Sequence, residues 1–151
     1  MKTNIYPFYL LLLIMLLGSN VSLKAQEDLK INSIYEKYGK QKGSTLVVLS
    51  GKSLHDHKLD KYKGITLNAD KDIIKEIQIC LESDVKKAKQ IKEVISDGII
   101  TSGFYQLSDK NSKTNRYILY KIVDGGKATL IYLEGGPESE ELINQLFIKK
   151  K

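Results

Sequence analysis

The sequence predicts an α+β fold, a single domain in which a mainly antiparallel sheet of about five strands packs against a long central helix and a C-terminal helix. Three observations support this prediction. Apolar residues recur at helical spacing through about residues 70–96, three β-rich segments follow, and an Asp-Gly-Gly turn joins the last two of them. The chain has 151 residues and carries no repeat and no low-complexity linker.

Residues 1–25 are predicted to be a secretory signal peptide. The apolar run from Tyr9 to Gly18 is about half of the roughly 20 residues that a membrane-spanning helix needs. Lys2 precedes this run and a polar segment ends at Ala25, after which we expect cleavage. The mature domain is then 26–151, long enough for one core, without a stable membrane anchor and located in the periplasm or elsewhere in the cell envelope. An uncleaved N-terminal tether is the alternative.

The first half of the mature chain predicts two helices and two strands. A short amphipathic helix starts near Asp28, and the unbroken apolar run at 44–50 predicts a strand that is buried on both faces in the middle of the sheet. A second strand is expected at 62–68. The longest helix is expected from about Asp70 to Ser96, with Asp97-Gly98 ending it. Its apolar stripe consists of Ile73, Ile77, Leu81, Val85, Ala88, Ile91 and Ile95.

The second half is β-rich and ends in a helix. Strands are expected at 102–109, 115–123 and 127–134. Gly135-Gly136-Pro137 then breaks the last strand and opens a final helix. Glutamates occupy its first turn and the lysines at 149–151 follow its end, the arrangement that a helix dipole favours.

The hairpin at 115–134 predicts an interaction surface. A two-residue turn at Asp124-Gly125 or at Gly125-Gly126 places the same residues on one face in either register. One face collects Ile118, Tyr120, Ile122, Thr129, Ile131 and Leu133, and the other collects Tyr117, Leu119, Lys121, Val123, Ala128, Leu130 and Tyr132. Since both faces are apolar, something must cover the second one. The cover is either another segment of the chain or a partner, a second copy or a ligand lying on Tyr117, Lys121 and Tyr132.

The residues that could carry chemistry do not form a catalytic pattern. His55 and His57, on either side of Asp56, are the only histidines. Two ligands are too few for a zinc site, which uses three or four protein ligands, so we interpret them as solvated and keep a copper or zinc site as a weak alternative. No G-x-S-x-G elbow and no phosphate-binding loop occurs in the sequence. We therefore expect no catalytic residues, no bound metal and no cofactor.

Charge argues against a nucleic-acid partner. The formal net charge is +6, and it falls to +4 when Lys2 and Lys24 leave with the signal peptide. Lysine supplies all but one of the basic residues, and Arg116 is the single arginine. Specific reading of phosphates and bases favours the planar arginine fork, so these lysines are interpreted as a solvated surface.

Three stretches carry a resemblance to a known group of proteins. "INSIYEKYGKQKGSTLVVLS", "DVKKAKQIKEVISDGIITSGFYQL" and "NRYILYKIVDGGKATLIYLEGGPESEELINQL" resemble small exported proteins of Bacteroidota in an uncharacterised family, a domain of unknown function. The resemblance covers about residues 31–148 and implies export, without an activity or site residues.

These observations favour a non-enzymatic accessory module of the cell envelope that binds another protein or itself. A carrier or sensor of a small apolar or anionic ligand is the alternative. It requires a cavity between sheet and helix beside Ile118, Ile122 and Leu133. An enzyme is the least supported interpretation.

Overall fold

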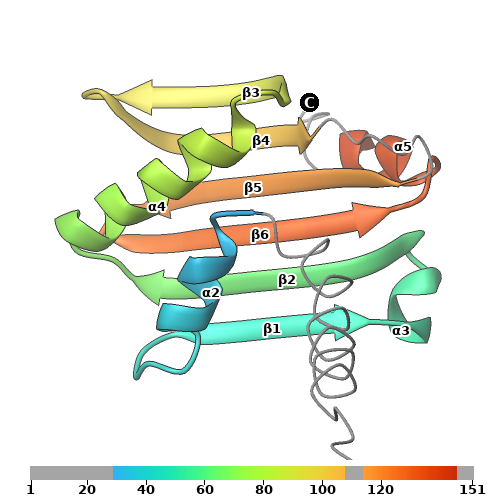
Figure 1. The fold of residues 1–151 in the computed structure, drawn as a ribbon, viewed down its shortest axis with the longest axis horizontal. Helices are drawn as coiled ribbons and strands as arrows, with labels where there is room; N and C mark the ends of the chain where they lie inside the picture. The colour runs from blue at the N-terminus through green and yellow to red at the C-terminus, as the bar shows by residue number, and fades with distance from the viewer. Residues whose placement is uncertain (1–28, 108–113, 146–151) are drawn as a thin grey trace, which may run out of the picture.

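The structure is a computed structural model that describes residues 29–107 and 114–145. The predicted signal peptide at 1–25 and the lysines at 149–151 lie outside these residues. The described chain is a mixed α and β structure built on one antiparallel sheet (Figure 1). This confirms the predicted class.

In the part of the chain that the structure describes, six strands form the sheet in the order β1-β2-β6-β5-β4-β3, and every neighbouring pair is antiparallel. The strands are β1 (Thr45–Ser50), β2 (Leu59–Asn68), β3 (Lys89–Ser96), β4 (Ile99–Leu107), β5 (Asn115–Val123) and β6 (Lys127–Gly135). The helices within the described residues are α2 (Asn32–Tyr38), α3 (Lys52–His55), α4 (Lys71–Val85) and α5 (Ser139–Ile143).

Two of the helices cover one face of the sheet, which we call the helix face. The helices α2 and α4 cross it side by side (Figure 1), and both contribute to the larger hydrophobic core. Ile34 of α2, Ile77 and Leu81 of α4, and Ile118 and Leu130 of the sheet are completely buried there. The opposite face, which we call the open face, carries a second, smaller core around Ile143 of α5.

The prediction that the long helix reaches Ser96 is wrong for its second half. The helix α4 ends at Val85, and residues 89–96 form β3, the sixth strand. Asp97 and Gly98 both have positive φ, +52° and +75°, and Ser96 pairs with Ile99 across them. Two positive φ values define a type I′ turn, whose twist suits an antiparallel hairpin. The Asp-Gly pair therefore turns a strand and does not end a helix.

The strand at 44–50 does not lie in the middle of the sheet as predicted. It is found as β1, and it forms an edge of the sheet. Val47, Val48 and Leu49 are 40%, 59% and 41% exposed, although all three are apolar. An unbroken apolar run is typical of a strand buried on both faces, and here that rule fails.

The predicted register of the last hairpin is also wrong. Val123 pairs with Lys127, so three residues form the loop instead of two. The N–H group of Gly126 donates to the carbonyl of Val123 at 3.2 Å, and Gly125 has φ +91° between them. The extra residue moves every side chain of β6 to the other face relative to β5.

Candidate interaction surface

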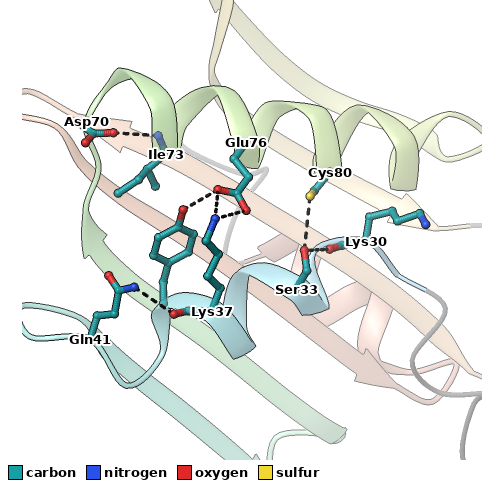
Figure 2. Close-up of polar contacts among 9 residues, drawn as sticks. Lys30, Ser33, Lys37, Gln41, Asp70, Ile73, Glu76 and Cys80 are labelled. Atoms are coloured by element: carbon teal, nitrogen blue, oxygen red, sulfur yellow. Dashed lines mark hydrogen bonds and ion pairs between the residues drawn. The ribbon is translucent and has the colours of Figure 1, made fainter.

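The seam between α2 and α4 is polar and fixes α2 against α4. The carboxylate of Asp84 accepts the N–H groups of Lys30 and Ile31 at 2.7 and 2.8 Å, just before α2 begins. Eight residues before Asp84 in α4, Glu76 accepts from the hydroxyl of Tyr38 and from the ammonium of Lys37. The contact with Lys37 measures 2.9 Å (Figure 2). The hydrogen bond from Tyr38 is the main cause that lowers the pKa of Glu76 below its usual value.

Cys80 lies in the same seam. Its thiol is half-buried, with Sγ at 3.7 Å from the hydroxyl oxygen of Ser33 (Figure 2). The side chains of Glu76, Cys80 and Asp84 recur every four residues, so they form the face of α4 that meets α2. The seam is therefore a structural contact between two helices.

The open face of the sheet is divided into polar and apolar rows, which follow from the strand registers. One row crosses five strands and is entirely polar, consisting of Thr45, Thr66, Thr129, Lys121 and Ser102. Two further rows lie closer to α3 and α5 and are largely apolar. They consist of Val47, Gly64, Ile131, Leu119 and Phe104, and of Leu49, Tyr62, Leu133, Tyr117 and Gln106.

The helix α5 covers one end of the two apolar rows. Ile143 buries Phe104, Tyr117 and Leu133, which are at most 6% exposed. The rings of Phe104 and Tyr117 stack with their centroids 5.9 Å apart. This cover stops at the middle of the sheet, because Leu119, Ile131 and Tyr62 are only partly buried against it.

The rest of the apolar rows forms a surface that we call the apolar strip, defined by Val47, Leu49, Tyr62, Leu119 and Ile131. It runs from half-buried residues in the middle of the sheet to Val47 and Leu49 at the β1 edge, which are 40% and 41% exposed. The ring of Tyr62 lies over Gly64, where an added Cβ would be 2.9 Å from the tyrosine hydroxyl. A glycine thus lets an aromatic ring lie flat on the strip.

The face predicted from Tyr117, Lys121 and Tyr132 does not exist as one surface. The hairpin register places Tyr117 and Lys121 on the open face and Tyr132 on the helix face. Tyr117 is 1% exposed beneath α5, Lys121 is exposed in the polar row, and Tyr132 donates from its hydroxyl to Glu134 at 3.1 Å. Sequence reasoning missed the apolar strip, although the three-residue Asp-Gly-Gly loop could have indicated the correct faces.

The two histidines lie at the end of the sheet that carries α3 and α5, near the turn into β2. His55 ends α3, the N–H group of His57 donates to the carbonyl of Leu54 at 2.9 Å, and both side chains are exposed. Within residues 29–107 and 114–145, no three His, Cys, Asp or Glu side chains lie close enough together to hold a metal ion.

None of the helices in the described segments has the length and apolar character needed to cross a membrane. A comparison with curated proteins finds no match for this chain. A family of unknown function, DUF6108, matches residues 19–146, which is most of the sequence. This match includes every helix and strand of the sheet domain described above, and the chain therefore belongs to the DUF6108 family of unknown function.

Proposed function

We propose that this chain is an exported accessory protein of the cell envelope that has no catalytic role and acts by binding another protein through the apolar strip. The observation that carries the proposal is the exposure of apolar side chains on a sheet face that α5 covers only at one end. Contiguous apolar surface rimmed by polar residues is typical of protein-binding sites. The row of threonines, Lys121 and Ser102 supplies such a rim on one side.

The chemistry of the strip suits a protein partner. Tyr62 presents a large ring with a polar hydroxyl, the kind of side chain that is enriched in protein interfaces. Val47 and Leu49 add apolar area beside it, and no charged residue of the described sheet lies within these rows between β1 and β5. A partner with an apolar patch of its own would bury these groups without desolvating a charge.

The ligand-carrier alternative is not supported by the side chains expected to line its cavity. Ile118 and Ile122 lie on the helix face with α4, whereas Leu133 lies on the open face beneath α5. These three residues do not line one cavity.

The test places a photo-crosslinking phenylalanine derivative at Tyr62 and, as a control, at Ile79, which is 60% exposed on α4. We expect a crosslink to one defined envelope protein at position 62 and none at position 79. That protein, once purified, should bind Tyr62→Ser at least about tenfold more weakly than wild type, because aromatic anchors dominate interfaces, and should bind Ile79→Ser normally. Equal crosslinking at both positions, or equal binding by both variants, contradicts the proposal.

Export is tested separately by the mass of the protein isolated from its own cells. A chain beginning at Gln26 supports removal of a signal peptide. A chain that keeps Met1 would exclude that processing.

A further inference from the structure

The two edges of the sheet differ in how they are protected against pairing with another strand. Natural edge strands carry lysines, prolines or bulges that block the approach of a further strand. The β3 edge has such protection, because Lys89 and Lys92 lie on it and its register with β4 shifts between Gln90 and Lys92 and again between Val94 and Ile95.

The β1 edge has none of these protections. Its six residues, "TLVVLS", contain no charge, proline or glycine, and its register with β2 runs without a shift from Thr45 to Ser50. Val47 and Leu49 point to the open face and Val48 points to the helix face, so the edge is apolar on both sides. A short uncharged segment of high β-propensity is the type of sequence that adds to a strand of its own kind.

We propose that β1 pairs antiparallel with β1 of a second copy of this chain, which joins two sheets into one continuous sheet across a two-fold axis. A second copy fits this edge because any register of "TLVVLS" with itself brings only threonine, leucine, valine and serine opposite one another. No like charges then meet between the six residues of one β1 and those of the other, although the chain is positively charged overall.

The lysines of the neighbouring strand do not oppose this pairing. Lys61 and Lys63 lie on β2, and Lys61 forms an ion pair with Glu134 at 3.6 Å. In the dimer the two β2 strands are three strand spacings apart, about 14 Å. That separation exceeds the Debye length of about 8 Å at physiological ionic strength, so repulsion between these side chains is largely screened.

The symmetry of the pairing fixes its centre. A two-fold axis perpendicular to the sheet must bring one residue opposite its own copy, because directly opposed residues point to the same face. For a pairing centred on this segment, that residue is Val47 or Val48. The same axis keeps both open faces on one side, so the two apolar strips meet and form one longer surface. What that surface binds rests on the proposed function, whereas the strand pairing can be tested alone.

The first test is sedimentation of the purified chain 26–151 and of two double variants. We expect the wild type to dimerise between about 1 and 500 µM, because a single strand pair is a small interface. Val47→Lys with Val48→Lys should be monomeric throughout this range. The control, Val94→Lys with Ile95→Lys on β3, should dimerise as wild type does, and its positions match in exposure at 44% and 60% against 40% and 59%.

All four positions are exposed, so the folds should survive, and circular dichroism checks this. A wild type that stays monomeric, or a dimer that the β1 variant retains, overturns the proposal. Neither result bears on the crosslink at Tyr62, which tests a different protein partner.

The second test uses single cysteines in a Cys80→Ser background. Facing residues of an antiparallel pair have Cα atoms about 4.5 or 5.5 Å apart, within the range that a disulfide spans. Val47→Cys or Val48→Cys should therefore form a covalent dimer on mild oxidation, and Val94→Cys should not. Yields at both Val47 and Val48 that are no higher than the yield at Val94 would show random collision and contradict the pairing.

Discussion

Replacing Tyr117 separates a core role from a surface role for this side chain. The hydroxyl of Tyr117 is buried and makes no hydrogen bond of good geometry with the described residues, although the side chains of Ser139 and Asn115 lie nearby. The ring stacks on Phe104 and lies under Ile143. Burial raises the pKa of Tyr117 above its usual value, so the hydroxyl is neutral at physiological pH.

Two substitutions give opposite results on this account. Tyr117→Ala removes a fully buried ring and should lower the free energy of unfolding by about 3–5 kcal/mol, as aromatic truncations in cores do. Tyr117→Phe keeps the ring and removes a buried hydroxyl that lacks a partner, so it should be neutral or stabilising by about 1 kcal/mol. Urea unfolding followed by circular dichroism measures both values. A loss above about 1 kcal/mol for Tyr117→Phe, or no loss for Tyr117→Ala, would refute this placement.

Four further substitutions test the contacts that hold the helices and strands together. Asp84→Ala removes two hydrogen bonds at the start of α2 and should cost about 1–2 kcal/mol in urea unfolding, as the loss of a helix cap does; no loss would mean that the start of α2 is held by other contacts. Gly103→Ala would place a Cβ at 2.5 Å from the ring of Tyr105, which is 1% exposed, and should cost about 1–3 kcal/mol by overpacking. Gly64→Ala meets a half-buried tyrosine that can move, so its cost in the same assay should be clearly smaller, and equal costs would contradict the argument. Because the folded-state pKa of Glu76 lies below its unfolded value of 4.5, Glu76→Gln should destabilise the protein at pH 7, and the difference from wild type should shrink as the pH falls below 4.5. A difference that stays constant down to pH 3 would exclude this titration.

The local patterns of the sequence predicted most strands and the first helix. Apolar spacing located α2, in which Ile34, Tyr35 and Tyr38 are buried as expected. The strands predicted at 62–68, 115–123 and 127–134 lie within or close to the observed β2, β5 and β6. Alternation and β-branched residues are local signals, so a single sequence is sufficient to find them.

The length of α4 could not be decided from spacing alone. Ile91 and Ile95 continue a helical period from Ile77 and Leu81, yet they belong to β3. An Asp-Gly pair fits both a helix end and a type I′ hairpin, since both need positive φ. The pairing of β3 with β4, from Lys89 opposite Gln106 to Ser96 opposite Ile99, distinguishes the two.

The candidate surface depended on two facts that no local pattern contains. The place of β1 at the edge follows from strand order, which the sequence does not reveal. Whether Tyr132 lies on the helix face or the open face depends on whether two or three residues form the loop. One additional loop residue moves every side chain of β6 to the other face of the sheet. For these reasons the prediction that Tyr117, Lys121 and Tyr132 share one face was wrong.

Hydrogen exchange of the backbone amides of β1 distinguishes a free edge strand from one that is paired with a second copy. In a monomer an edge strand exposes amides to solvent, whereas a paired strand protects them. Exchange followed by mass spectrometry at low and high protein concentration should show protection of residues 45–50 rising with concentration, and no such change in β3. Protection of residues 45–50 that does not depend on concentration, or an equal rise in β3, would contradict the pairing of β1 with a second copy.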